Sequence, residues 1–372
     1  MDDNLRIIIS GGGTGGHIFP AISIANAIKN KCPKAEILFV GALGRMEMQR
    51  VPNAGYNIKG LPICGFDRKN ILKNIKVLYK IWESQRLAKK IIKEFRPMVA
   101  VGVGGYASGP TLNECAKANI PCLIQEQNSY AGVTNRLLAK KANKICVAYD
   151  GMEKFFPKEK IIKTGNPVRQ NLLETTLSKE EAIASLGLDP TKTTVLIVGG
   201  SLGARTINES VLKHIDEIKT SNVQFIWQTG KYYFKSVKEK LIEYGEMPML
   251  KVLDFISDMG AAYKAADLVI SRAGASSISE FCLIGKPVIL VPSPNVAEDH
   301  QTKNALALVN KDAALYVKDS EAEERMISLA IDTVKNKERL EMLSENIKKL
   351  AFPNSAEVIA NEVLNLAKMD IN

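Results

Sequence analysis

Short runs of apolar, often β-branched residues alternate with longer segments of helical periodicity along the whole chain. Runs with few polar residues are typical of strands buried on both faces, and intervening helices return the chain so that such strands lie parallel. Two sets of such strands predict an α/β fold with two doubly wound parallel-sheet domains. The strands are expected at residues 6–10, 36–40, 98–103, 121–125 and 144–148, and then at 193–199, 223–230, 251–256, 267–271 and 287–292.

The boundary between the two domains is expected at the end of the segment GNPVR at 165–169, beyond which the chain becomes polar. The first domain then covers residues 1–168 and the second covers residues 169–352. Near the end of the chain, Pro353 separates two helical patterns, because proline lacks an N–H and clashes with the preceding turn. We expect the helix within residues 353–372 to pack back on the first domain.

Composition narrows the functional classes. The chain has 372 residues, of which 46% are hydrophobic and 24% are charged, as in ordinary globular proteins. The six cysteines form no Cys-x-x-Cys pair, which argues against structural zinc and disulfides and fits a reducing cytoplasm. We expect no signal peptide and no apolar run of the roughly 18 to 20 residues that span a bilayer. The net charge of +10 suits nucleic acid, anionic lipid or phosphorylated substrates.

Three glycine-rich turns follow predicted strands, at 10–17, 102–110 and 199–205. Glycine lets the backbone approach a ligand closely, and the N-terminus of a following helix offers free N–H groups to an anion. The helix after the first turn is expected to begin near Pro20. Turns at the carboxyl ends of parallel strands in both domains predict a phosphate-rich ligand in the cleft between them.

The first turn also matches the dinucleotide-binding pattern G-x-G-x-x-G through Gly11, Gly13 and Gly16. That interpretation needs an acidic residue at the end of the second strand to hold a ribose. The second strand begins with Glu36 and ends in apolar residues, so its only acidic side chain is at the wrong end. The pattern therefore does not favour a nicotinamide cofactor, and we expect no cofactor.

Residues 271–301 contain further candidates for ligand-binding residues. Small residues open a helix after the strand at 267–271, and Glu280 falls about one turn into it. Its carboxylate suits the diol of a ribose, which donates two hydrogen bonds. The alternative is a helix-start charge worth a few tenths of a kcal/mol. A polar helix start follows the strand at 287–292, and its Gln301 can both donate to and accept from sugar hydroxyls.

Seven motifs occur in the order and spacing of one family, and the similarity runs from about Ile7 to the last helix. The motifs are GGGTGGH, GVGGYASGP, QEQNSYAGVTN, GNPVR, GGSLGA, SRAGASSISE and EDHQTKNA. With these motifs the chain resembles the MurG-type UDP-N-acetylglucosamine–N-acetylmuramyl-(pentapeptide) pyrophosphoryl-undecaprenol N-acetylglucosamine transferases.

The resemblance implies the α/β GT-B fold, in which two Rossmann-like, doubly wound parallel-sheet domains face a cleft. It further implies a peripheral enzyme on the cytoplasmic face of the cell membrane. It also implies inverting transfer of N-acetylglucosamine to the C4 hydroxyl of N-acetylmuramic acid in lipid I, which forms lipid II. The alternative is an enzyme of the same fold that acts on another lipid or on a small-molecule acceptor.

The family's motifs also imply site residues in the first domain and at the boundary. Thr14, Gly15 and Gly16 would lie where donor and acceptor meet. Asn128 would contact the donor sugar region, and Arg169 would approach the diphosphate.

In the second domain, the resemblance places Ser201 near the diphosphate and the backbone of Ile256 near uracil. Gln301 would contact the sugar or diphosphate, whereas His300 stands where some family members have a second glutamine and is a less certain contact. The residues that would hold ribose and phosphate are Ala275, Ser276, Ser277, Ile278, Ser279 and Glu280.

Inverting displacement needs a base for the acceptor hydroxyl and stabilisation of the departing UDP. No Asp-x-Asp motif follows a strand in a suitable place, so we expect no metal site and activity that survives a chelator. His17 is the favoured general base because it ends the first glycine turn; its alternative role is to shape that turn. Glu126 is the rival base.

The composition of residues 68–96 indicates a candidate binding partner of the chain. This stretch holds ten basic residues and two acidic ones, and Ile71, Ile75, Leu78 and Trp82 recur on one helical face. Such a helix suits an anionic membrane surface, although a helix that covers a sheet also needs an apolar stripe. Aromatic residues are only 6% of the chain and do not cluster, so nucleic acid is not expected as a partner.

Overall fold

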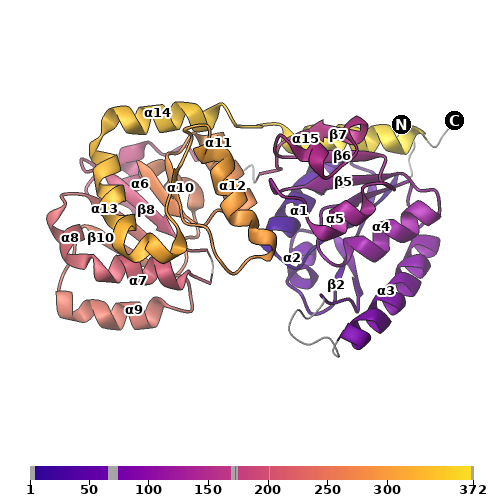
Figure 1. Cartoon of the computed structure of the whole chain (residues 1–372), viewed down its shortest axis with the longest axis horizontal. Helices are drawn as coiled ribbons and strands as arrows, with labels where there is room; N and C mark the ends of the chain where they lie inside the picture. Colours follow the sequence, from indigo (N-terminus) through magenta and orange to yellow (C-terminus); the bar gives the residue numbers. More distant parts are fainter. Residues whose placement is uncertain (1–4, 66–73, 169–171, 173–174, 201, 370–372) are drawn as a thin grey trace. The chain divides into compact units, whose positions relative to one another are not determined.

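The computed structural model describes residues 5–65, 74–168, 172, 175–200 and 202–369. The chain divides into two compact units, Met1–Val168 with Phe352–Asn372, and Arg169–Ala351 (Figure 1).

The first unit is built on a seven-stranded parallel sheet. Its strand order is β3-β2-β1-β4-β5-β6-β7, so the chain starts in the middle and winds outward in both directions. The strands are β1 (Arg6–Ser10), β2 (Glu36–Ala42), β3 (Asn57–Leu61), β4 (Val99–Gly102), β5 (Cys122–Glu126), β6 (Lys144–Val147) and β7 (Ile161–Lys163).

Helices cover both faces of this sheet. Ile7 and Ile9 of β1 belong to one core, to which α1 and α15 contribute, while Ile8 belongs to the core under α3, α4 and α5. All three isoleucines are fully buried, as continuous apolar strands require. The helices are α1 (Gly15–Lys31), α2 (Glu47–Asn53), α3 (Asn74–Phe95), α4 (Ser108–Lys117), α5 (Val133–Leu138) and α15 (Ser355–Met369).

The second unit repeats the architecture with six parallel strands in the order β10-β9-β8-β11-β12-β13. The strands are β8 (Thr194–Val198), β9 (Gln224–Gln228), β10 (Leu250–Leu253), β11 (Leu268–Ser271), β12 (Val288–Leu290) and β13 (Leu315–Tyr316). The helices are α6 (Lys179–Ser185), α7 (Arg205–Lys213), α8 (Ile215–Thr220), α9 (Phe234–Leu241), α10 (Met259–Ala265), α11 (Ala275–Ile284), α12 (His300–Val309), α13 (Ala322–Lys335) and α14 (Lys337–Lys348).

The ten strands expected from the sequence are present, but the sheets contain three more, β3, β7 and β13. All three are edge strands of two to five residues, and none is buried along its whole length. Hydrophobic pattern alone does not reveal such strands, because an edge strand needs fewer apolar residues.

The expected start of the first helix near Pro20 is wrong, because α1 begins at Gly15. Proline removes one helical hydrogen bond but has a helical φ, and Pro20 is buried inside the helix. The earlier start places His17 in the first turn of α1.

The glycine turns after β1 and β4 pack directly on each other. A β-carbon at Gly105 would lie 2.4 Å from the carbonyl oxygen of Gly12, and one at Gly11 would lie 2.2 Å from a methyl carbon of Val103. No real side chain tolerates these distances, so only glycine allows the two turns to approach this closely.

The second unit uses the same device between β8 and β9. A β-carbon at Gly203 would lie 2.1 Å from the carbonyl oxygen of Thr229, and one at Gly230 would lie 2.1 Å from the amide nitrogen of Gly203. The turn that follows β8 is therefore held against the turn that follows β9 by direct backbone contact.

This contact predicts a large loss of stability for Gly230→Ala. The new methyl would overlap Gly203 and would sit at a φ of +82°, so we expect a cost of about 3 kcal/mol. Gly187→Ala is the matched control, because its φ is +74° but only the end of Lys251 approaches, and it should cost about 1 kcal/mol. Urea unfolding followed by the fluorescence of the fully buried Trp227 measures both changes. Equal losses in the two variants would contradict the role of the contact.

Candidate functional site

His17 is held by the turn that follows β1. Its Nδ1 lies 3.0 Å from the carbonyl oxygen of Gly12 and 3.2 Å from the hydroxyl of Thr14. A carbonyl oxygen only accepts, so Nδ1 carries the proton and donates to Gly12. In the neutral ring, Nε2 then bears the lone pair, which is the form a general base requires.

The second glycine turn supports the other edge of the same ring. A β-carbon at Gly104 would lie 2.9 Å from His17 Nε2, and Gly104 has a φ of +91°. The imidazole therefore rests on the Gly104 backbone, where any side chain would displace it. Of the expected first-domain residues, Thr14, Gly15 and Gly16 lie in the same turn as His17.

Glu126, the rival base, has a carboxylate whose two oxygens both accept hydrogen bonds from the loop after β5 and from α5. Its side chain is 1% exposed. Oε1 accepts hydrogen bonds from the backbone N–H and the side-chain amide of Asn128, at 3.1 and 3.4 Å. Oε2 accepts from the N–H of Gly132 at 3.0 Å and from the amide of Asn135 at 2.9 Å. The carboxylate thus organises the loop after β5 and brings Asn128 beside it, an arrangement that favours His17 as the base.

Glu47 is a buried carboxylate that no sequence motif marks. It accepts hydrogen bonds from the N–H of Gly13 at 2.9 Å and from the N–H of Ala42 at 3.0 Å. In the sequence it is one acidic residue at a helix start, and nothing there shows that its side chain turns toward the first glycine turn.

In the second unit, α11 presents an open N-terminus directly after β11. Its N-cap is Gly274, which supplies no side-chain oxygen, and its first turn has no acidic residue. The first helical bond is donated by Ile278 to Gly274, so the N–H groups of Ala275, Ser276 and Ser277 have no intrahelical acceptor. The buried hydroxyl of Ser276 also has no hydrogen-bond partner within the described structure. Such an end attracts an anion.

Glu280 lies in the second turn of the same helix. It is 4% exposed and accepts a hydrogen bond from the hydroxyl of Tyr263 at 3.1 Å. A charge at that depth gains little from the helix dipole, whose effect fades within the first turn. The helix-start interpretation of Glu280 is therefore weak. Ser279 instead bonds within the helix, donating to the carbonyl of Ala275 at 3.0 Å.

The two other described candidates of the second unit follow different strands, β12 and β10, which are not adjacent in the sheet. Gln301 lies in the first turn of α12, and its Oε1 accepts the N–H of Ser293 at 2.8 Å, which leaves its Nε2 as a donor. Ile256 follows β10 and is 5% exposed. Arg169 and Ser201 lie outside the described residues.

Other reactive groups of the two units have structural roles or are inactive. Arg272, which follows β11, pairs with Asp319 and donates to the carbonyls of Val291 and Pro292. Burial raises the pKa of the Cys282 thiol in α11 to about 12, so this thiol stays protonated. Among the described residues, no group of three or more His, Cys, Asp and Glu side chains is arranged to hold a metal ion.

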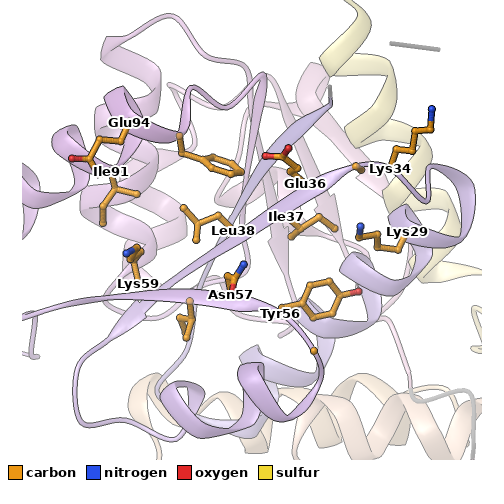
Figure 2. A pocket seen from close by; sticks show the side chains of 14 residues that line it. Lys29, Lys34, Glu36, Ile37, Leu38, Tyr56, Asn57, Lys59, Ile91 and Glu94 are labelled. Atoms are coloured by element: carbon orange, nitrogen blue, oxygen red, sulfur yellow. The ribbon is translucent and has the colours of Figure 1, made fainter. Parts of the chain in front are cut away.

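A groove of about 710 Å³ lies at the opposite end of the first sheet (Figure 2). It is lined by the first residues of β2 and β3, including Glu36 and Asn57, and by the ends of α1 and α3. None of the candidate residues lines it. The glycine turns follow the carboxyl ends of the strands, so the candidate site residues of this unit lie at the other end of the strands from the groove.

Helix α3 directs apolar residues in two directions. Val77, Ala88 and Ile91 are buried against the first unit. Leu78 and Trp82 are 58% and 55% exposed, as is the neighbouring Tyr79 at 62%. The interpretation of Leu78 and Trp82 as part of a stripe that covers the sheet is therefore wrong. Ile71 lies outside the described residues.

Comparisons with known proteins cover both units. Residues 7–147 match the glycosyltransferase family 28 N-terminal domain, and residues 194–359 match the glycosyltransferase family 28 C-terminal domain. A crystal structure of MurG from Acinetobacter baumannii superposes with a TM-score of 0.79 at 26% identity, covering 97% of this chain and 99% of that one.

Two curated relatives carry the same name, UDP-N-acetylglucosamine–N-acetylmuramyl-(pentapeptide) pyrophosphoryl-undecaprenol N-acetylglucosamine transferase. The relative from Phocaeicola vulgatus is 71% identical over 99% of this chain and 98% of its own length. The relative from Bacteroides thetaiotaomicron is 66% identical over the full length of both chains. With such identity across both units, the chain belongs to the MurG family of glycosyltransferases, which has the GT-B fold of two Rossmann-like domains.

Proposed function

We propose that this chain transfers N-acetylglucosamine from UDP-N-acetylglucosamine to the C4 hydroxyl of N-acetylmuramic acid in lipid I, forming lipid II for peptidoglycan synthesis. The observation that carries the proposal is the identity of 66–71%, over nearly the whole chain, to transferases named for this donor and acceptor. The first unit would take the acceptor and the second the donor.

The chemistry follows from the two sets of residues. His17 Nε2 takes the proton of the acceptor hydroxyl as its oxygen attacks the anomeric carbon. The bond from that carbon to the UDP oxygen breaks on the opposite face, so the configuration inverts. Negative charge develops on the departing diphosphate, and the open N–H groups of α11 stabilise it.

Donor recognition would involve the remaining candidates. Glu280 accepts from the ribose hydroxyls, Gln301 donates its Nε2 to the sugar or diphosphate, and the backbone of Ile256 contacts uracil. Arg169 and Ser201 would add contacts to the diphosphate.

The direct test of the proposed function is transfer of labelled N-acetylglucosamine from its UDP form to a lipid I analogue, with other sugar nucleotides as competitors. We expect a lipid II analogue as product and weak competition from the other donors. Transfer to a different lipid or small-molecule acceptor, with none to lipid I, would overturn the proposed acceptor.

His17→Ala should reduce kcat by roughly 10²- to 10⁴-fold, the usual contribution of a general base. UDP affinity should stay nearly unchanged, because His17 belongs to the unit that would hold the acceptor. His214→Ala is the control, since that imidazole bonds Glu217 and Glu323 in the second unit. If His17→Ala retains full turnover, the base must be sought at Glu126.

Glu280→Gln should raise the KM for UDP-N-acetylglucosamine roughly 10- to 100-fold, because the diol would lose a charged acceptor worth about 1–3 kcal/mol. Tyr263→Phe is the matched control, as it removes a partner of Glu280 without touching the carboxylate. Steady-state kinetics and melting curves separate the outcomes. An unchanged KM with a lower melting temperature would assign Glu280 to the fold alone.

The protein would work as a peripheral enzyme at the cytoplasmic face of an anionic membrane, because its acceptor is anchored in lipid. No described helix is both long and apolar enough to pass through a bilayer. The exposed Leu78, Tyr79 and Trp82 of α3 would enter the interface, and the cation of Arg86 lies 6.0 Å from the Trp82 ring.

Replacing Lys69, Lys73, Lys76 and Lys80 with glutamine should weaken binding to anionic vesicles at least tenfold at low salt, since each basic residue contributes about 1 kcal/mol. Activity on a short-chain, water-soluble acceptor should be spared. Vesicle sedimentation at two salt concentrations measures the effect.

The control for this test removes the same charge elsewhere, from Lys235, Lys238 and Lys240 of α9 and Lys335 of α13, all exposed. If the two quadruple variants bind vesicles equally well, α3 is not the anchor.

A further inference from the structure

One peptide group in the first glycine turn is hydrogen-bonded on both sides. The N–H of Gly13 donates to Glu47 Oε2 at 2.9 Å, and the carbonyl of Gly12 accepts from His17 Nδ1 at 3.0 Å. These two groups belong to the same peptide, which is planar and rigid. A bond that orients its N–H therefore also aims its carbonyl.

Glu47 is well placed to hold that peptide. It starts α2, yet its carboxylate turns back into the unit and is only 1% exposed. Its second oxygen accepts from Ala42, the last residue of β2, at 3.0 Å. A buried carboxylate is stable only when hydrogen-bonded, and two N–H groups from different segments meet that need. The carboxylate thus ties the glycine turn to the end of β2.

Two glycines make room for this side chain. A β-carbon at Gly12 would lie 2.2 Å from Glu47 Oε1, and one at Gly41 would lie 2.6 Å from Glu47 Cγ. The carboxylate therefore occupies a space that ordinary residues at either position would fill. A simple helix-start charge would need no such space.

We infer that Glu47 is a positioning residue for His17 and acts through the peptide between Gly12 and Gly13. The carboxylate orients the peptide and polarises it, because hydrogen bonds in a chain strengthen one another. The more negative carbonyl then holds the proton on Nδ1 and keeps Nε2 as the basic nitrogen. The arrangement resembles the carboxylate–imidazole pair of a catalytic triad, with one peptide inserted between the two groups. This role rests on the proposed function, in which His17 is the base.

Glu47→Gln tests the inference with little change in shape. The amide still accepts one hydrogen bond, but its NH₂ opposes the N–H of either Gly13 or Ala42. We expect kcat to fall about 10- to 100-fold while the KM for UDP-N-acetylglucosamine stays within about twofold. Glu114→Gln is the matched control: this carboxylate is 8% exposed in the same unit, bonds Lys117 and Asn113, and should leave kcat unchanged.

A double variant separates positioning from general support of the fold. If Glu47 acts through His17, then Glu47→Gln combined with His17→Ala should be no slower than His17→Ala alone. Two results would overturn the inference. One is a fall in kcat of the double variant equal to the product of the two single falls. The other is a kcat of Glu47→Gln within twofold of the parent.

A measurement on the unaltered protein covers the case in which Glu47→Gln does not fold. The chain has only three histidines, so ¹⁵N-histidine labelling resolves each ring, and the His17 signals are those lost in His17→Ala. We expect His17 with its proton on Nδ1. A neutral ring whose only proton is on Nε2 would overturn the inference, because Nδ1 could not then donate to Gly12. Failure of the unaltered protein to transfer N-acetylglucosamine to lipid I would instead count against the proposed function, and the tautomer would still test Glu47.

Discussion

The close approach of backbone to backbone at the carboxyl ends of neighbouring strands is the constraint on which the candidate site depends. In the first unit Gly105 meets Gly12, and in the second Gly230 meets Gly203, at distances that leave no room for a β-carbon. Each contact fixes a turn that follows a strand. In the first unit the helix that carries His17 begins directly after such a turn.

Peptide groups, more than side chains, shape the candidate residues of each unit. In the first unit, the Gly12 carbonyl accepts from His17 Nδ1 and the Gly104 backbone supports the ring. In the second unit, the first amides of α11 have no intrahelical acceptor. Side chains such as Glu47 and Glu126 act mainly by orienting peptide groups. In the proposed reaction, the amides of α11 would stabilise the departing diphosphate as preorganised dipoles, which need not reorganise during the reaction.

Hydrophobic periodicity was sufficient to predict both sheets, because their central strands are buried on both faces. It did not reveal β3, β7 and β13, which lie at sheet edges and need few apolar residues. The three glycine-rich turns could be recognised in the sequence, since they follow predicted strands. The side chain that bonds the first turn could not be recognised, because Glu47 lies more than thirty residues beyond that turn. Only the fold turns its carboxylate toward Gly13. Periodicity likewise placed Leu78 and Trp82 on one face of α3, but only the structure shows that this face is exposed.

A crystal structure of the chain with UDP-N-acetylglucosamine tests most directly whether backbone groups hold the donor. We expect diphosphate oxygens about 3 Å from the amides of Ala275, Ser276 and Ser277 and a ribose hydroxyl on Glu280. A diphosphate bound through a metal ion, or bound away from the N-terminus of α11, would contradict this expectation.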